Sequence, residues 1–245
     1  MIKCENVTKS FGDLNVIDDI TVRIKKGEFV VLLGPSGCGK STFLNIIAGF
    51  EHPTKGNIEV NGRAINKPGK DRGFVFQDYA LFPWKTVMGN VMSGLDMRDK
   101  QKKRETAMHY IQKVGLEKFA DTYPHELSGG MKQRVSIARA LAYEPEILLM
   151  DEPFGALDAQ TRKLMQQELL KILKDFNKTI VFVTHSVIEA VYLADRVLVF
   201  SNLPAKIIYE EDIHIEGERN YLNDDFLEYR KEILYYLDSQ TGIRE

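Results

Sequence analysis

Two spacings of apolar residues alternate along this chain. Residues 2–8 and 20–25 alternate apolar and polar side chains, as strands with one exposed face do, and residues 10–18 between them form a turn-rich connection. Short, largely apolar runs predict further strands, at residues 29–33, 57–60, 73–76, 147–150, 180–183, 197–200 and 206–209. The run at 29–33 has no polar interruption, which predicts a strand buried on both faces.

Helical spacing occupies the middle of the chain, from about residue 87 to 142, and includes residues 105–116 and 131–143. Two later helices are predicted at about 159–175 and 223–237. Strands and helices alternate again after the central helical span. This alternation predicts an α/β fold, in which helices cover a largely parallel sheet and a helical insertion separates its two halves.

Composition narrows the class of protein. Of 245 residues, 44% are hydrophobic and 28% are charged, and 33 basic against 35 acidic side chains give a formal net charge of −2. These values are ordinary for a globular protein of one large or two small domains and give no polycation for nucleic acid. No apolar run approaches the roughly 18–20 residues that span a bilayer. The acidic stretch 210–225 is expected to be solvated surface.

Two cysteines, Cys4 and Cys38, offer no disulfide framework, and the N-terminus has no apolar signal-peptide core. Cys38 lies inside a glycine-rich loop that a disulfide would block. We therefore expect a chain that faces the cytosol with reduced thiols.

The stretch GPSGCGKST carries the first candidate chemistry. It follows the predicted strand 29–33 and precedes a helical pattern, which is the context of a phosphate-binding P-loop rather than of a glycine-rich turn that matches by chance. Its glycines allow backbone N–H groups to converge, and the helix dipole adds positive potential. Lys40 reaches the β- and γ-phosphates, and Ser41 offers a hydroxyl to Mg²⁺. The candidate nucleotide-binding residues are Gly34, Pro35, Ser36, Gly37, Cys38, Gly39, Lys40, Ser41 and Thr42.

The segment ILLMDEP places two carboxylates after four apolar residues. A buried strand that ends at Asp151 delivers this side chain to the carboxyl edge of the sheet, where it can hold Mg²⁺ through its water shell. Glu152 comes next and can polarise a water molecule for attack on the γ-phosphorus. The alternative is an exposed acidic turn, which becomes less attractive with a P-loop upstream.

Between these elements lies LSGGMKQR, residues 127–134. Here the chain resembles the ATP-binding cassette family, whose signature is LSGG followed by a helix with Gln-Arg. The resemblance extends from the N-terminus to about residue 210. Four further residues match the family's motifs in the family's order, namely Phe11 for adenine, Gln77 of the Q-loop, Asp158 of the D-loop and His185 of the switch loop.

The resemblance implies roles for these residues in ATP hydrolysis. The implied catalytic residues are Lys40, Gln77, Glu152 and His185, and the implied Mg²⁺ ligands are Ser41, Gln77 and Asp151. Two alternatives stay open from the residues alone. Phe11 suits either adenine stacking or the core, and a lone histidine such as His185 is more often structural than functional before its context is considered.

The signature segment also implies a partner. Ser128, Gly129 and Gly130 precede a helix, so they form a second anion-binding N-terminus. In the family this element closes over the ATP held by another subunit. The resemblance therefore implies a head-to-tail homodimer with two ATP molecules and with Asp158 at its seam.

The resemblance further implies a P-loop NTPase fold with a mainly parallel sheet core, an N-terminal antiparallel β subdomain and a helical signature subdomain. We expect one domain over residues 1–245. Its core and β subdomain comprise about 1–84 and 143–210, the helical subdomain about 85–142, and a C-terminal helical tail about 211–245.

Residues 77–91, QDYALFPWKTVMGNV, distinguish this chain within the family. Their LFPW resembles importer ATPases of the nitrate, sulfonate, taurine and pyrimidine-precursor type, in which this region receives a helix of the membrane permease. Tyr79, Leu81, Phe82 and Trp84 form an aromatic-rich patch for such a partner, unless Trp84 belongs to the core. Ala205 in SNLPAK replaces a glycine of this subgroup, and Ser186 replaces an acidic residue that often follows the switch histidine.

The leading hypothesis is thus an ATP-hydrolysing importer subunit at the cytoplasmic face of the membrane. It would bind separate permease subunits through the region Gln77–Trp84 and, indirectly, an extracytoplasmic solute-binding protein. The alternative is a cassette ATPase that acts on nucleic acid or ribosomes. A near-neutral charge and a single short basic run, KQKKR at 100–104, disfavour nucleic acid. An exporter is disfavoured by the LFPW segment and by our expectation that the chain carries no membrane domain.

Overall fold

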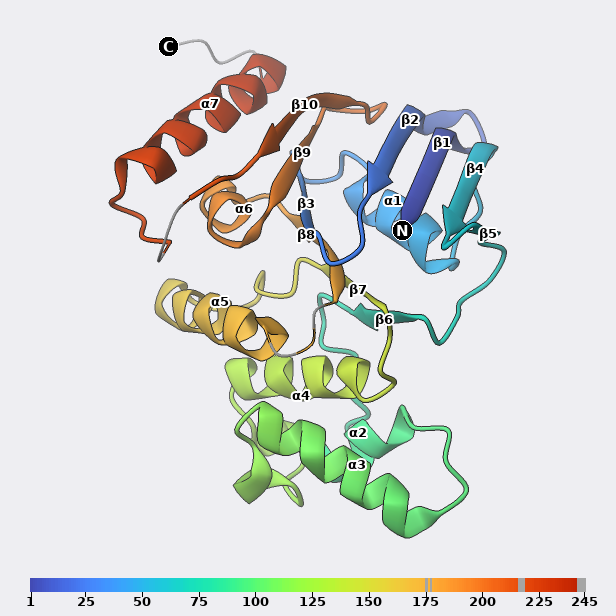
Figure 1. Cartoon of the computed structure of the whole chain (residues 1–245), viewed down its shortest axis with the longest axis vertical. Helices are drawn as coiled ribbons and strands as arrows, with labels where there is room; N and C mark the ends of the chain where they lie inside the picture. The colour runs from blue at the N-terminus through green and yellow to red at the C-terminus, as the bar shows by residue number, and fades with distance from the viewer. Residues whose placement is uncertain (175, 177, 216–218, 242–245) are drawn as a thin grey trace. The chain divides into compact units, whose positions relative to one another are not determined.

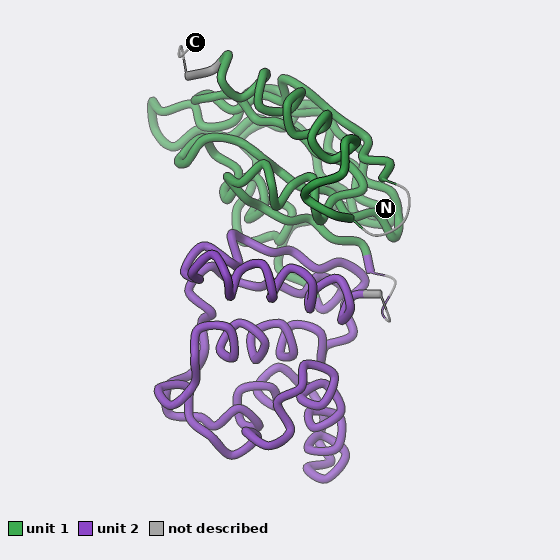
Figure 2. Tube along the Cα trace, turned by 90° about the vertical axis from the view of Figure 1, so that its left-hand side faces the viewer, with its two compact units in different colours: residues 1–69, 179–245 green, residues 70–178 purple. Residues whose placement is uncertain are grey.

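A computed structural model describes the whole chain except residues 175, 177, 216–218 and 242–245. The chain divides into two compact units, shown in Figure 2. Unit 1 comprises residues 1–69 and 179–245, and unit 2 comprises residues 70–178. The phosphate loop, residues 34–42, belongs to unit 1, and the signature segment, residues 127–134, belongs to unit 2.

Unit 1 contains an antiparallel sheet ordered β2-β1-β4-β5 and a group of strands ordered β10-β9-β3-β8 (Figure 1). Strand β3 is parallel to β8 and to β9, and β10 is antiparallel to β9. The elements are β1 Ile2–Phe11, β2 Leu14–Ile24, β3 Phe29–Leu33, α1 Lys40–Ala48, β4 Lys55–Val60, β5 Arg63–Ala64, β8 Thr179–Thr184, α6 Val187–Leu193, β9 Arg196–Phe200, β10 Ile207–Asp212 and α7 Asp224–Thr241.

The parallel strands form the apolar core of unit 1. All residues of β3 and β8 are buried, which explains why their sequences lack the polar alternation of a half-exposed strand. Leu33 pairs with Thr184 of β8 and with Val199 of β9. These three strands therefore end together at one edge, where the phosphate loop begins.

The expected turn-rich connection at residues 10–18 is wrong. Strand β1 runs to Phe11 and β2 starts at Leu14, and these two residues pair across a tight hairpin. Gly12 adopts a φ of 57°, which a glycine adopts without steric cost. The register between β1 and β2 shifts three times, twice between Val7 and Ser10, and these shifts hide the alternation of the strands near the tip from the sequence.

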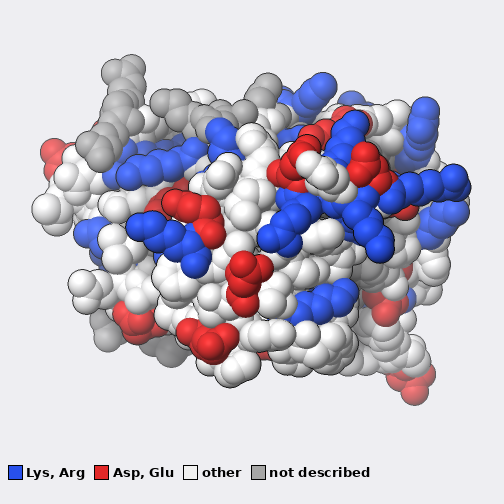
Figure 3. All heavy atoms as spheres, turned by 90° about the horizontal axis from the view of Figure 1, so that it is seen from below, with Lys and Arg blue, Asp and Glu red and all other residues white. Residues whose placement is uncertain are grey.

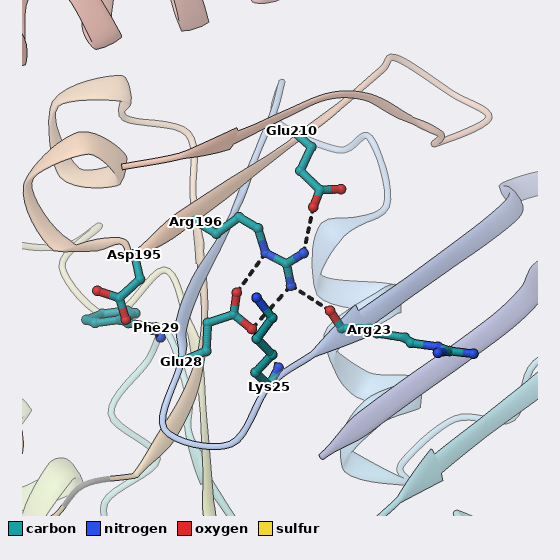
Figure 4. A network of polar contacts seen from close by, with 7 residues as sticks. All are labelled: Arg23, Lys25, Glu28, Phe29, Asp195, Arg196 and Glu210. Atoms are coloured by element: carbon teal, nitrogen blue, oxygen red, sulfur yellow. Dashed lines mark hydrogen bonds and ion pairs between the residues drawn. The ribbon is translucent and has the colours of Figure 1, made fainter. Parts of the chain in front are cut away.

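A network of polar contacts closes the opposite end of unit 1 (Figure 4). The guanidinium of Arg196, at the start of β9, lies 2.8 Å from the Glu28 carboxylate and 2.6 Å from that of Glu210 on β10. It also donates to the Arg23 carbonyl oxygen, at 2.6 Å. Glu210 is thus an ion-pair partner within the acidic stretch that we expected to be only solvated. Residues 216–218 of that stretch lie outside the described residues.

Unit 2 contains two parallel strands and most of the helices (Figure 1). Its elements are β6 Arg72–Val75, α2 Val87–Ser93, α3 Lys100–Lys113, two 3₁₀ turns at Glu117–Phe119 and Pro124–Glu126, α4 Gly129–Leu141, β7 Ile147–Asp151 and α5 Ala159–Lys174. Helix α4 contacts α2, α3 and α5, so the signature segment starts the central helix of this unit.

This architecture confirms the α/β fold with a mainly parallel core, an antiparallel β sheet and a helical region around the signature segment. The basic run at 100–104 begins α3, where most of its side chains are exposed, as expected. Among the described residues, no helix is both long and apolar enough to cross a membrane.

Candidate functional site

The phosphate loop is shaped by close approaches that only glycine permits. A Cβ atom at Gly34 would lie 2.9 Å from the Phe200 carbonyl oxygen of β9. Gly39 has a φ of 112°, and a Cβ atom there would lie 3.1 Å from Val16 and 3.4 Å from the Ala205 methyl group. The loop therefore bends tightly against β9 and β2 and delivers α1 with its first N–H groups facing outward.

Lys40 is the charged group of this loop. Its ammonium donates to the carbonyl oxygens of Gly34, at 2.8 Å, and Pro35, at 2.6 Å, and the residue is only 3% exposed. The Cys38 thiol lies 3.8 Å from the same nitrogen, and burial raises the pKa of this thiol. A phosphate oxygen can replace these carbonyl oxygens as the acceptor. The bond from the Lys40 ammonium is then stronger, because both donor and acceptor are charged.

Ser36 and Ser41 are exposed on this loop, whereas Thr42 is partly buried. The Ser41 hydroxyl therefore stands at the first turn of α1, next to the buried Lys40. A hydroxyl beside bound phosphates suits Mg²⁺, which prefers oxygen ligands and keeps several of its waters.

His185 lies at the same edge of unit 1 as the phosphate loop. It directly follows Thr184, the residue paired with Leu33, just as Gly34 directly follows Leu33. The His185 side chain is exposed. Ser186 caps α6 by accepting from the Glu189 N–H, and Thr184 donates to the buried Glu189 carboxylate at 2.5 Å. These bonds fix the backbone around His185. They also show that serine at position 186 acts as the N-cap of α6.

Phe11 is 46% exposed at the tip of the β1–β2 hairpin, so the alternative of a core aromatic is wrong. The Lys9 ammonium lies 4.6 Å from the centre of its ring and also bonds to the Glu51 carboxylate and the His52 carbonyl oxygen. Val16 of the same hairpin approaches Gly39. The hairpin thus carries a flat apolar face next to the phosphate loop.

Gln77 and Glu152 converge in unit 2. Val75 pairs with Met150, so both residues lie two positions beyond paired strand ends. A Cβ atom at Gly155 would lie 3.6 Å from Gln77 Nε2 and 3.8 Å from Glu152 Oε2. Glu152 has a left-handed φ of 40° that turns the chain sharply after the partly buried Asp151. An amide and a carboxylate at one point suit the orientation of a water molecule or a hydrated cation.

The signature segment forms a second helix N-terminus in unit 2. Ser128 caps α4 by accepting from the Met131 N–H at 3.3 Å. A Cβ atom at Gly129 would lie 3.0 Å from Leu157, and one at Gly130 would lie 3.2 Å from Thr161 of α5. The signature and D-loop segments therefore pack together.

Asp158 is exposed and caps α5, accepting from the N–H groups of Gln160 and Thr161. These hydrogen bonds, with that from Thr161 strongest, lower the pKa of its carboxyl group. Asp158 is therefore ionised at neutral pH and fixed next to the signature segment.

An aromatic surface follows Gln77 in the chain. Trp84 is 70% exposed and Phe82 38% exposed, with ring centres 5.6 Å apart, so the alternative of Trp84 in the core is wrong. The fully buried Asn90 accepts from the Phe82 N–H and donates to the carbonyl oxygens of Phe82, Lys85 and Thr86. We call residues 79–86 the coupling loop.

Three supporting residues escaped the sequence analysis. Lys9, Asn90 and Arg139 each act through backbone or ring contacts that no motif records. Asn90 left a signal, because it is a polar residue among the buried residues Val87, Met88 and Val91. Lys9 and Arg139 left none, since basic residues on strands and helices are usually solvated.

Comparison with known proteins gives a consistent result. The family model described as "ABC transporter" matches residues 17–155. Among curated relatives, an uncharacterized ABC transporter ATP-binding protein of Methanocaldococcus jannaschii, MJ0412, is 50% identical, covering 98% of this chain and 92% of its own length. The aliphatic sulfonates import protein SsuB of Bacillus cereus is 44% identical (93% and 90% covered), and the nitrate import protein NrtD of Synechocystis is 50% identical (84% and 79%).

Two solved structures share the fold. They are dimeric structures of the cassette MJ0796, the second in a post-hydrolysis state bound to ADP and Pi. Their TM-scores are 0.76 and 0.75 and their identities 36% and 35%, and each match covers 88% of this chain and 100% of theirs.

Proposed function

This chain belongs to the ABC transporter family, and from that premise we propose that it is the ATP-hydrolysing subunit of a membrane importer. The observation that carries the importer assignment is the exposed aromatic surface of the coupling loop, which begins two residues after Gln77. A large, ordered and exposed aromatic pair is the composition of a protein-binding surface. Its position links that surface to the residues that contact nucleotide.

In unit 1, the phosphate loop binds the triphosphate through its outward N–H groups and Lys40, while the adenine stacks on Phe11. His185 contacts the γ-phosphate from the neighbouring strand end. The supporting observation is the strand register, which places the residues before Gly34 and His185 side by side. Because His185 is exposed, it is accessible to a ligand at this edge.

In the catalytic step, Glu152 polarises the attacking water, and Gln77 orients this water. The residues that would hold Mg²⁺ are Ser41 of unit 1 and Gln77 and Asp151 of unit 2, and the ion would supply positive charge to the phosphate oxygens. The donors fit this ion, because Mg²⁺ bound with a nucleotide requires only one or two carboxylates besides phosphates and waters. The described residues contain no cluster of three or more acidic, histidine or cysteine residues that would hold a metal without nucleotide.

The functional form is a head-to-tail homodimer with two ATP molecules. Ser128, Gly129 and Gly130 contact the ATP that the phosphate loop of the other copy holds, and Asp158 lies at the seam. The solved dimers of a related cassette and the packing of Leu157 against the signature glycine support this arrangement. Each copy thereby contributes a helix N-terminus to each nucleotide.

The partner of the coupling loop is a permease subunit at the cytoplasmic face of the membrane. The relatives SsuB and NrtD are named for sulfonate and nitrate import, and these names support a small-solute importer. An extracytoplasmic solute-binding protein is the indirect partner that the proposal adds. On the face shown in Figure 3, acidic and basic side chains are interspersed rather than segregated. Such a face lacks the basic stripe of a nucleic-acid-binding protein.

The decisive experiment is co-purification of the chain with co-expressed permease subunits. We expect a stable complex that the Trp84→Ala variant fails to form. The Tyr235→Ala variant is the matched control, because Tyr235 is 71% exposed on α7, outside the coupling loop. Equal retention of both variants would contradict the assignment of the coupling loop. Salt-sensitive binding to nucleic acid or ribosomes without a membrane partner would favour the alternative function instead.

A further inference from the structure

Arg139 forms an unusual bond pattern for a helical arginine. Its guanidinium donates to the carbonyl oxygen of Ala80 at 2.6 Å and to that of Tyr79 at 3.0 Å. Burial lowers the pKa of this group. Within the described part of unit 2 no carboxylate pairs with Arg139, so its charge is used on two successive carbonyl groups of the coupling loop.

These two carbonyls belong to a strained stretch of backbone. Tyr79 has a φ of 57° and Ala80 a φ of 47°, and they are the only adjacent non-glycine residues with positive φ in the described chain. Left-handed conformations are costly for residues with a Cβ atom and persist where the surroundings enforce them. The fork geometry of arginine is well suited to enforce this one, because it binds both carbonyls at once.

The same stretch contacts the start of the signature helix. A Cβ atom at Gly129 would lie 3.3 Å from the Tyr79 hydroxyl, so the phenol packs at the N-terminus of α4 while Arg139 extends from near its C-terminus. Asn90 then fixes residues 82–86 with four hydrogen bonds. A continuous chain of contacts thus joins α4 to the exposed rings of Phe82 and Trp84.

We propose that Arg139 is a positioning residue that holds Tyr79 and Ala80 in the left-handed conformation, and so joins the signature helix to the partner-binding face of the coupling loop. When α4 moves, Arg139 makes Trp84 move with it. Without Arg139, the loop relaxes toward unstrained conformations and its aromatic face loses its fixed position relative to Gln77. This inference rests on the proposed function only for the identity of the partner.

A glycine substitution separates this role from simple packing. Glycine adopts positive φ without steric cost, so Ala80→Gly lowers the energy of the native loop conformation. It should therefore compensate for the loss of Arg139 if enforcement of the conformation is what Arg139 does. Arginine that merely fills space would not be compensated by a smaller residue elsewhere.

The test uses amide hydrogen exchange of residues 77–86 and the fluorescence anisotropy of Trp84, the single tryptophan of the chain. In Arg139→Ala we expect roughly 10- to 100-fold faster exchange in the loop, the factor for a lost charged hydrogen bond, and lower Trp84 anisotropy. Arg139→Lys should be intermediate, because one ammonium cannot reproduce the fork. Adding Ala80→Gly to Arg139→Ala should recover part of the loss.

The matched control is Arg134→Ala. Arg134 lies on the same helix but interacts with the Val114 carbonyl oxygen and the Glu168 carboxylate, away from the coupling loop. In Arg134→Ala, amide hydrogen exchange in the coupling loop and the fluorescence anisotropy of Trp84 should equal those of the wild type. Wild-type exchange in Arg139→Ala, or no recovery by Ala80→Gly, would overturn the proposal. Should Arg139→Ala not fold, Arg139→Lys with and without Ala80→Gly decides in its place.

A second arm measures ATP turnover with and without the permease. We expect the stimulation ratio to fall in Arg139→Ala and to recover in the double variant. If the permease does not stimulate even the wild type, the proposed function fails, while the exchange data still decide the role of Arg139. If the wild type is stimulated and Arg139→Ala equally so, the positioning role is rejected.

Discussion

The two candidate anion-binding helix N-termini are that of α1 in unit 1 and that of α4 in unit 2. Both present the backbone N–H groups of a helix start, but their side chains differ in chemistry. Helix α1 follows Gly39, which makes no side-chain cap, and its first residue is the buried Lys40. Helix α4 follows Ser128, whose hydroxyl is already bonded to the Met131 N–H, and it starts with two glycines. The first N-terminus thus supplies a cation together with backbone N–H groups, and the second supplies little beyond its dipole.

This difference suggests how binding and closure are divided. Hydrogen bonds to a charged group contribute about 1.5–3 kcal/mol each, whereas a helix dipole contributes only about 0.3–1 kcal/mol to an exposed anion. Unit 1 is therefore expected to bind ATP alone. In the proposed dimer, the signature helix is expected to add only a small binding free energy, and only when another copy brings its phosphate to this helix. A weak second contact keeps closure reversible, as a cycle of hydrolysis requires.

The largest expected effect separates closure from chemistry. Glu152→Gln keeps the size of the side chain but removes its basicity, so ATP turnover should fall about 10²- to 10⁴-fold, the range for loss of a general base. ATP binding should persist, and an ATP-bound dimer should accumulate in gel filtration.

Adding Ser128→Asp to Glu152→Gln should abolish that dimer. Aspartate caps a helix as well as serine does, but it places a negative charge where the partner's phosphates are expected. Ser128→Asn is the neutral control. Turnover at the wild-type rate in Glu152→Gln would remove Glu152 from the catalytic role, and an unchanged dimer in the Ser128→Asp background would separate the signature helix from closure.

A smaller effect is expected from a substitution at the N-terminus of α1, and it tests whether this helix start is the one that binds ATP. Lys40→Ala should weaken ATP binding to the monomer about 10- to 100-fold, because a charge-assisted bond is lost. Ser128→Asp should leave monomer affinity unchanged. Titration calorimetry at concentrations below dimer formation measures both. If the two variants lost affinity equally, the assignment of binding to α1 and closure to α4 would be wrong.

The sequence predicted the parts of the molecule that local rules determine. Buried strands, the glycine-rich loop and the signature helix all lie where periodicity and motif context placed them, because strand burial and helix starts are encoded within about ten residues. The prediction for residues 10–18 was wrong because the irregular register of the β1–β2 hairpin interrupts the alternation of apolar and polar side chains.

Long-range contacts could not be predicted in this way. The convergence of Gln77 and Glu152 depends on the pairing of β6 with β7, strands that lie 75 residues apart at Val75 and Met150. The bonds of Arg139 reach 59 and 60 residues back along the chain. No local pattern distinguishes such an arginine from a solvated one, since its partners are backbone carbonyls that every residue possesses.

The smallest expected effect concerns the contribution of Lys9 to ATP binding by unit 1. Lys9→Met removes the cation over the Phe11 ring and the bonds to Glu51 and His52, so ATP affinity should fall about two- to fivefold through a less ordered stacking surface. Lys3→Met is the control, because Lys3 lies on the same strand in an exposed pair with Glu5.

Tripolyphosphate, which lacks a base, discriminates between the phosphate loop and the Phe11 ring of unit 1. Lys40→Ala should weaken tripolyphosphate and ATP alike, whereas Lys9→Met should weaken ATP alone. Equal losses for both ligands in Lys9→Met would mean that Lys9 acts through the phosphate loop and not through the Phe11 ring.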